Sequence, residues 1–411
     1  MLDLFRDVVR NLRAHKLRFA LTSLGIFWGA TMLTYLSATA IGSERGFQEQ
    51  LDRTGPRVVW AMSGTVTKDR VGERGARPLE LEVEDVGRID AYRHIDRSSP
   101  ELWMWNKMVR AGPRTRLLSV VGLDADGLAI RNFELAAGRA IDPLDVERAR
   151  PVAFLGAEAS HRLFGTRPAV GQTVRIEGIP FQVIGVAARK GDQLIHMGGK
   201  DDELVLIPDS TAMRALMRDE KVARFVFEPR TLDETATAIR SAREITALHH
   251  HFDPNDEIAM AFVDVKTIYD ILDVLFDALR IFLVGVGLVT MLVGAIGVMN
   301  IMLVVVGERT QEIGVRKALG ATNRAIFALF LGESVAVAGV SGLAGAAVGF
   351  AFIQLTRMTV DAENARLAQP IFDPGMTAFI VTALFVVGLL AGVLPAVRAS
   401  RVEPSESLRA S

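Results

Sequence analysis

The segment GERTQEIGVRKALGAT, residues 307–322, is short and highly charged, and it lies between two long apolar stretches. Its charged residues are spaced for a helical surface, and they are Glu308, Arg309, Glu312, Arg316 and Lys317. A polar helix between two membrane spans is typical of a cytoplasmic connection that docks against another protein. We therefore interpret residues 307–325 as a cytoplasmic coupling loop.

Four apolar segments surround this loop in the chain, each long enough to cross about 30 Å of hydrocarbon at about 1.5 Å per residue. They are residues 19–41, 282–306, 326–353 and 376–397. None has a charged residue near its centre, although Glu333 lies near one end of the third. We interpret Glu333 as reaching interfacial water, with a functional role as the alternative. The pattern predicts a polytopic α-helical membrane protein with four transmembrane helices.

Composition agrees with a membrane anchor joined to a polar domain. The 411 residues are 50% hydrophobic and 23% charged, so polar and apolar residues must lie in separate regions. The formal net charge of −1 argues against a nucleic-acid partner, since phosphate binding needs a clustered basic excess. The chain has no cysteine, which excludes disulfides, thiolate metal sites and a cysteine nucleophile.

Lysine and arginine distribution predicts the orientation. Basic residues gather before the first span, between the second and third, and after the fourth, so both termini are expected in the cytoplasm. Residues 1–18 have the pattern of an amphipathic helix on the inner membrane surface, and residues 398–411 form a cytoplasmic tail. Residues 354–375 form a short external loop. The first span is too long for a typical signal peptide, so we favour an anchor over a cleaved leader.

The predicted extracytoplasmic domain, residues 42–277, is long enough for two subdomains. Alternating apolar residues and turn signals predict a β-rich subdomain over about residues 117–190 within a large α+β core. Helical periodicity continues from about residue 263 into the second span, which predicts a stalk helix over about residues 263–281. The fold class is therefore a four-helix membrane protein with an α+β domain inserted between helices 1 and 2.

No catalytic, cofactor-binding or metal-binding residue is predicted in this domain. Consecutive residues point in different directions on a regular element, so the run His249, His250 and His251 is interpreted as an exposed loop before the stalk. The alternative is a metal cluster of these histidines with Asp253 and Asp256. Trp103 and Trp105 are expected on one face of a strand, in the core or on a binding surface.

Glycines recur at four-residue spacing in three of the spans, which lets helix backbones approach closely in lipid. The pairs are Gly25 and Gly29, Gly345 and Gly349, and Gly388 and Gly392. This spacing favours close packing within one chain or between two copies, and we expect a dimer.

The loop ERTQEIGVRKALGAT, residues 308–322, resembles the signature loop of the FtsX-like and MacB-like ABC transporter permeases, the type VII or mechanotransmission class. HKLRFALTSLGIFWG at residues 15–29 is similar to the entry to that family's first span. GRAIDPLDVERARPVAFLGAEASHRLFG at residues 138–165 is similar to its periplasmic core domain, and PAVRASRVEPSESLR at residues 395–409 to its C-terminal tail.

The resemblance implies a dimeric permease that moves no substrate between its membrane helices. In such proteins a cytoplasmic ABC ATPase dimer closes on ATP, and the shift passes through the coupling helix and stalk to the external domain. Carried over to this sequence, the ATPase-contacting positions are Glu308, Arg309, Glu312, Arg316 and Lys317. Leu319 and Gly320 would end that helix, because glycine is favoured just past a helix C-terminus. The alternative for these charges is a solvated loop facing lipid headgroups, which the positive-inside rule alone would produce.

Macrolide-exporter members carry a fused ATPase, but this sequence starts at the membrane entry and contains no GxxxxGK[ST] phosphate loop. We therefore expect a non-catalytic permease subunit that binds no cofactor directly, with ATP bound by an ATPase on a second polypeptide. The expected partners are that ATPase dimer, a second permease copy (identical or a paralogue), a periplasmic adaptor and membrane lipids.

Three functions follow from these observations. The first is export or extraction of an envelope substrate from the inner membrane. The second is transmission of force to a periplasmic partner, such as a cell-wall hydrolase, without transport. The third is a membrane-anchored hydrolase that uses the histidine run.

Overall fold

The computed structural model of the protein describes residues 16–69, 76–191, 193–217, 221–222, 224–359 and 369–403. Most of the predicted N-terminal amphipathic helix and of the C-terminal tail lies outside the described residues. The chain divides into two compact units, which we call the bundle, Met1–Gly46 with Leu272–Ser411, and the α+β unit, Phe47–Ile271.

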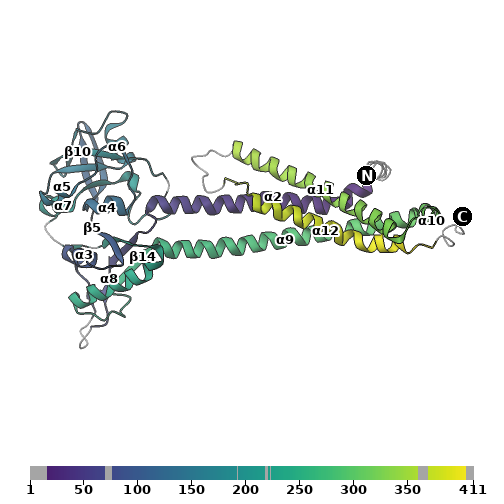
Figure 1. The fold of residues 1–411 in the computed structure, drawn as a ribbon. Helices are drawn as coiled ribbons and strands as arrows, with labels where there is room; N and C mark the ends of the chain where they lie inside the picture. The colour runs from purple at the N-terminus through teal and green to yellow at the C-terminus, as the bar shows by residue number, and fades with distance from the viewer. Residues whose placement is uncertain are drawn as a thin grey trace. The chain divides into compact units, whose positions relative to one another are not determined.

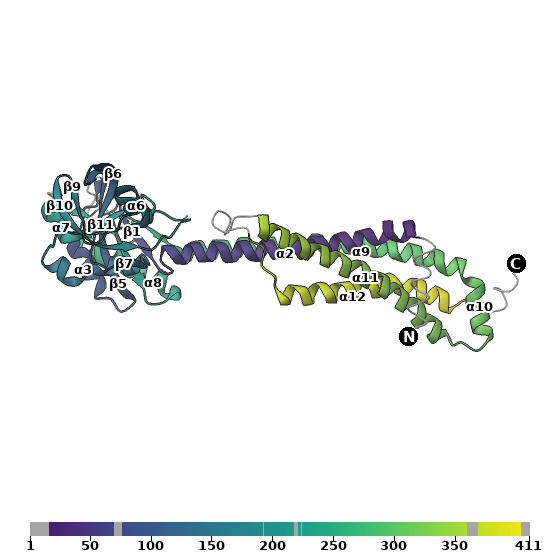
Figure 2. The same ribbon diagram turned by 90° about the horizontal axis from the view of Figure 1, so that it is seen from above.

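The bundle contains the long helices, which Figure 1 and Figure 2 show from two directions. They are α2 (Lys16–Thr54), α9 (Val265–Glu308), α11 (Asn323–Thr359) and α12 (Pro374–Ser400). Within the described residues these four, α2 from Leu24 onward, are long and apolar enough to cross a membrane. The predicted four-span membrane protein is confirmed. Helix α9 is one element of 44 residues that includes the predicted stalk segment and the second span.

The predicted glycine pairs lie where bundle helices approach each other most closely. A Cβ atom added at one glycine of each pair would collide with a neighbouring helix: 2.7 Å from the Gly294 Cα at Gly25, 2.1 Å from the Phe27 carbonyl oxygen at Gly345, and 2.7 Å from the Ser334 Cβ at Gly392. These distances are too short for any real side chain. The three pairs therefore serve the α2–α9, α11–α2 and α12–α11 contacts within one chain.

The α+β unit is built on a ten-stranded sheet with the order β14-β1-β13-β5-β6-β11-β8-β10-β7, to which β9 is added by pairing with β10 and β5. The strands are β1 (Val59–Ser63), β5 (Ile95–Ala111), β6 (Arg114–Leu123), β7 (Leu135–Gly138), β8 (Val152–Leu155), β9 (Thr173–Ile176), β10 (Ile179–Ala187), β11 (Val205–Pro208), β13 (Arg224–Pro229) and β14 (Met260–Asp264). Four short strands form two separate pairs: β2 (Thr65–Val66) with β3 (Arg77–Pro78), and β4 (Leu81–Glu82) with β12 (Lys221–Val222).

The 17-residue strand β5 joins the two halves of this sheet. Its first part pairs with β13, from Glu101 opposite Arg224, and its second part pairs with β6, from Leu102 opposite Gly122. The strands between residues 117 and 190 therefore belong to the same sheet as β1, β13 and β14. Strands β9 and β10 form a hairpin whose turn residues, Glu177 and Gly178, have positive φ angles of 49° and 87°, as a two-residue type I′ turn requires.

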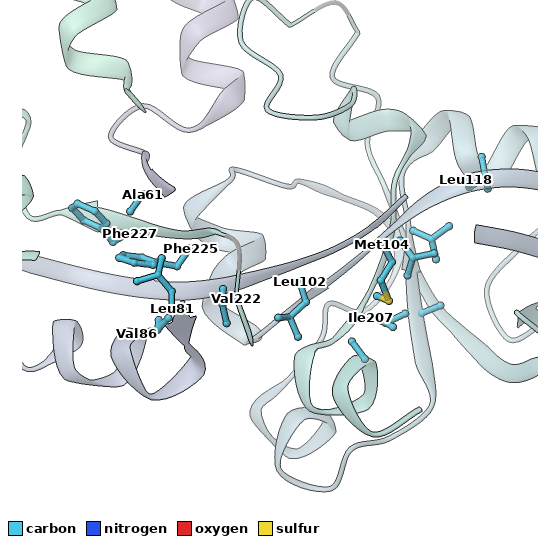
Figure 3. Packing of buried hydrophobic residues seen from close by; sticks show 14 of the residues in the cluster. Ala61, Leu81, Val86, Leu102, Met104, Leu118, Ile207, Val222, Phe225 and Phe227 are labelled. Atoms are coloured by element: carbon cyan, nitrogen blue, oxygen red, sulfur yellow. The ribbon is translucent and has the colours of Figure 1, made fainter. Parts of the chain in front are cut away.

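Helices cover both faces of the sheet, and its strands β8, β11 and β13 are therefore buried at every position. They are α3 (Val83–Asp90), α4 (Ala125–Ile130), α5 (Pro143–Glu147), α6 (Ala157–Phe164), α7 (Asp209–Ala215) and α8 (Thr235–His250), with 3-10 turns η1 (Asp201–Glu203) and η2 (Leu232–Glu234). The larger core includes Val86, Phe225 and Phe227, which Figure 3 shows with their neighbours. A second core, separate from the larger one, also packs against this sheet and includes Val121 of β6 and Phe154 of β8.

The expected exposed loop at the histidine run is wrong for two of its three residues. His249 and His250 form the end of α8, and His251 is the residue that caps this helix with a φ of 57°. The Arg77 guanidinium donates a hydrogen bond of 2.7 Å to the His250 carbonyl oxygen, which satisfies an acceptor that the helix end leaves unpaired.

Candidate functional site

The coupling loop folds into helix α10, Thr310–Ala318, and one side of this helix is buried in the bundle. Ile313 is 2% exposed and belongs to the same apolar cluster as Phe330 of α11 and Ala399 of α12. Gly314 beside it is buried as well. Helix α10 is therefore packed against the bundle along its length and is not a free surface loop.

Gly320 ends α10 with a hydrogen-bond pattern that only a left-handed residue permits. Its φ is +99°, its N–H donates to the Lys317 carbonyl at 3.0 Å, and the Ala321 N–H donates to the Arg316 carbonyl at 3.0 Å. This pair of bonds is a Schellman motif, in which glycine avoids the steric cost of a Cβ atom. Leu319 is the C-cap, and its side chain is 84% exposed.

Arg309, the N-cap of α10, joins this helix to a buried carboxylate of α11. Its NH1 atom lies 3.2 Å from Glu333 Oε1, and its Nε atom lies 3.3 Å from Glu312 Oε2. The Glu333 side chain is 8% exposed. The interpretation of Glu333 as reaching interfacial water is therefore wrong: it is buried in protein and paired with a guanidinium, which offsets the desolvation of its charge.

Lys317 fastens the other end of α10 to α12. Its Nζ atom donates to the carbonyl oxygens of Ser400 at 2.9 Å and Val402 at 2.7 Å. A cation is favourable there because the last carbonyls of a helix carry partial negative charge. Lys317 follows the buried Ile313 by four residues, so helical spacing already placed both side chains on the inward face.

The outward face of α10 combines charged and apolar side chains. Arg316 NH2 lies 2.7 Å from Glu312 Oε1, and both side chains are about two-fifths exposed. Val315 is 44% exposed, while Glu308, at the end of α9, is also exposed. Sequence reasoning missed Val315, although its position four residues before Leu319 was the available signal. Of the predicted coupling residues, Arg309 and Lys317 hold α10 in place, and Glu308, Glu312, Arg316 and Leu319 remain accessible.

The α+β unit contains a buried charge network that sequence reasoning also missed. Glu101 of β5 lies 2.9 Å from Arg131 and 2.7 Å from Arg224, and Asp201 pairs with Arg131 and, at 2.7 Å, with Lys190. All five side chains are at most 10% exposed. Burial favours the neutral acid, but the charges of Arg131 and Lys190 outweigh it and lower the pKa of Asp201. The residues of this network come from separate elements of the chain, so their spacing in the sequence does not indicate that they are in contact.

Trp103 and Trp105 lie on one side of β5, as predicted, with ring centroids 4.7 Å apart. Trp103 is half-buried: its Nε1 donates to Glu101 Oε2 at 3.0 Å, and the Arg224 guanidinium lies 4.3 Å from its ring centroid. Trp105 is 51% exposed. The pair therefore continues the charge network to the surface of the unit.

Models of two known families match most of the chain. The MacB-like periplasmic core domain matches residues 19–246, and the FtsX-like permease C-terminal region matches residues 284–404. This chain belongs to the MacB-like ABC transporter permeases. The resemblance inferred from the loop and tail motifs is confirmed, and this permease is a multi-pass membrane protein.

Curated relatives match this permease along its whole length. A macrolide export ATP-binding/permease protein, MacB, of Rhodospirillum rubrum is 32% identical over 98% of this chain and 59% of the relative. A pyoverdine export ATP-binding/permease protein, PvdT, of Pseudomonas entomophila is 29% identical over 99% of this chain and 60% of the relative. The chain thus spans about three-fifths of the length of these relatives.

Among solved structures, the periplasmic region of MacB from Actinobacillus actinomycetemcomitans aligns with 54% of this chain at 16% identity, with a TM-score of 0.44. The alignment covers 95% of that structure.

Proposed function

We propose that this permease couples ATP hydrolysis by a cytoplasmic ABC ATPase dimer to movements of its α+β unit, and that these movements drive export of an envelope substrate. The observation that carries this proposal is the attachment of α10. Arg309 binds Glu333 of α11 and Lys317 binds the end of α12, so a displacement of α10 must pull on both helices.

The outward face of α10 is the proposed docking site for the ATPase. Val315 and Leu319 supply apolar contact area, and the Glu312–Arg316 pair supplies charges that fix orientation. ATP is bound by the ATPase in this proposal, and the permease residues described above bind no cofactor directly.

Export is favoured over force transmission because the relatives quoted above are named for export of macrolides and of pyoverdine. We place the α+β unit in the periplasm, both termini in the cytoplasm and the bundle in the inner membrane, in agreement with the distribution of basic residues. A periplasmic adaptor that extends the path outward completes the assembly.

Replacing Leu319 by Glu tests the docking site. The side chain is 84% exposed, so the change leaves the bundle intact, while a buried carboxylate in the interface should weaken ATPase binding at least about tenfold. The measurement is co-purification of the ATPase with the tagged permease, together with the ATP hydrolysis rate in nanodiscs.

The matched control is Arg324→Glu, which places a carboxylate at an exposed position of the same connection, near the start of α11 and outside α10. Normal ATPase binding by Leu319→Glu, or an equal loss in the control, would contradict the assignment. Lys317 is unsuitable for this test because its ammonium also caps α12.

A further inference from the structure

Two adjacent histidines at the end of α8 meet a buried aspartate of α3. His250 Nε2 lies 2.8 Å from Asp85 Oδ2, and His249 Nε2 lies 4.0 Å from Asp85 Oδ1. The Asp85 side chain is 1% exposed, and His250 and His249 are 13% and 38% exposed. One ligand atom from each of the three residues lies within 4.8 Å of the others.

We propose that Asp85, His249 and His250 bind one Zn²⁺ ion. Imidazole nitrogens and a carboxylate oxygen are zinc ligands at about 2.0–2.2 Å, and three protein ligands with one water complete a tetrahedral site. In such a site neighbouring ligand atoms are about 3.3–3.5 Å apart, as follows from those bond lengths. The observed 2.8 and 4.0 Å lie on either side of this value, and the third separation is at most 4.8 Å, so side-chain rotations that shift these atoms by about 1 Å would form the site.

The convergence of two consecutive histidines depends on where Asp85 lies. Neighbouring residues on a helix point about 100° apart, and the two rings are nearly perpendicular, at 86°, with centroids 4.9 Å apart. Asp85 lies within reach of both rings, so the ligand atoms converge although the Cβ directions do not. The C-terminal end of α8 also favours a cation, because its last carbonyl groups carry partial negative charge.

Asp85 retains the capacity to bind a metal ion despite its other partners. Its Oδ2 accepts the Glu82 N–H at 2.9 Å, and its Oδ1 accepts Arg88 NH1 at 3.0 Å. A carboxylate offers about four lone-pair sites, and the direct bond to His250 would be exchanged for the metal. The Glu82 and Arg88 contacts hold the carboxylate in position, as outer hydrogen bonds do in zinc sites. Arg88 is also a competing cation, which lowers the metal affinity.

The ion would connect helix α3 to helix α8. Both helices contribute side chains to the larger core, through Val86 and Ala242, so a bound ion would restrain their separation. This proposal concerns a site in the α+β unit and does not depend on the ATPase-docking face.

The test uses the full chain in nanodiscs, purified with a streptavidin-binding tag instead of polyhistidine and stripped of metal. Titration with Zn²⁺ in competition with a chromogenic chelator measures affinity and stoichiometry, and Co²⁺ absorption reports tetrahedral coordination. We expect one ion per chain. Loss of an outer hydrogen bond alone costs about 10- to 100-fold in affinity, so His249→Ala and Asp85→Asn should each cost at least about 100-fold.

His251→Ala is the matched control, since it removes the adjacent imidazole that is outside the ligand group. His249→Ala is the cleanest variant because that side chain is partly exposed and lies 4.0 Å from Asp85. Unchanged affinity in His251→Ala, with loss in His249→Ala, supports the site. Equal losses in these two variants would indicate adventitious binding by a histidine run and overturn the proposal, as would absence of stoichiometric binding by the wild type.

Discussion

Single residues attach helix α10, the proposed coupling helix, to the bundle. Arg309, Ile313 and Lys317 follow one another at four-residue spacing and all face the bundle, so they attach α10 through one ion pair, one apolar contact and hydrogen bonds to backbone carbonyls. Glu312 and Arg316, which are also four residues apart, lie on the outward face of α10 and pair with each other. One charged sequence motif therefore contains both the residues that attach α10 and the proposed docking surface, and they differ in their spacing along the helix.

Asp124, the N-cap of α4, gives a prediction about pH. Its carboxylate accepts the N–H groups of Asp126 and Gly127, each at 3.0 Å, yet burial raises its pKa from 3.8 to about 7. Between these pH values the native state binds more protons than the unfolded state, so the free energy of unfolding falls as pH rises. The decrease is at most about 1.4 kcal/mol per pH unit.

Replacing Asp124 by Asn keeps the capping acceptor and removes the charge. We expect the variant to gain stability relative to the wild type from pH 5 to pH 7, as measured by denaturation of the full chain followed by tryptophan fluorescence. Trp60, Trp103 and Trp105 make that signal report mainly on the α+β unit. Asp126→Asn, at the exposed neighbouring position, should reduce the slope only slightly, because the Asp126 charge contributes less to the raised pKa of Asp124 than burial does. A stability difference that does not change with pH would contradict the prediction.

At the scale of elements, the helices of the bundle depend on glycine where they touch. A Cβ atom at Gly345 of α11 would lie 2.1 Å from the Phe27 carbonyl oxygen of α2, so Gly345→Ala must displace a backbone. We expect a loss of about 1–3 kcal/mol, typical of overpacking, measured as a lower unfolding temperature in detergent.

Gly339, on the same helix, is the matched control because a Cβ atom there meets nothing within 4 Å. Gly339→Ala should be neutral or slightly stabilising, since alanine favours helix by up to about 1 kcal/mol over glycine. Equal destabilisation by the two variants would mean that the loss of stability does not come from the α2–α11 contact at Gly345.

Elements were predictable from sequence where the signal is local. Long apolar windows located the four bundle helices, and alternating apolar residues with turn signals located strands between residues 117 and 190. Contacts between distant residues were not predictable: Glu101 and Arg131 are separated by 30 positions, and Asp85 and His250 by 165. A single sequence does not indicate which distant residues are in contact, so the charge network and the proposed zinc ligands could be identified only from the fold. The inward position of Lys317 was predictable, because Lys317 follows Ile313 by four residues and both therefore lie on the same face of the helix.

At the scale of the whole molecule, α9 indicates how two copies would associate. Val274, Leu275 and Ile281 are 71%, 57% and 74% exposed, although the nearby Asp273 and Asp277 belong to an aqueous environment and not to lipid. Around the helix, at about 100° per residue, these apolar side chains lie about 100–140° away from Arg280, which pairs with Glu44 of α2 at 2.8 Å. The face of α9 turned away from α2 is thus apolar, and no described residue of the chain covers these side chains.

We therefore expect a two-fold dimer in which this face of α9 meets its own copy. Because the chain has no cysteine, Leu275→Cys creates a single thiol, and in a symmetric interface near the axis two such thiols lie close together. Mild oxidation of membranes should convert most of this variant to a disulfide-linked dimer on non-reducing gels. Asp273→Cys, on the opposite side of the helix, should remain monomeric. Equal cross-linking of both variants would indicate random collision, and cross-linking that requires a co-expressed paralogue would replace the homodimer with a heterodimer.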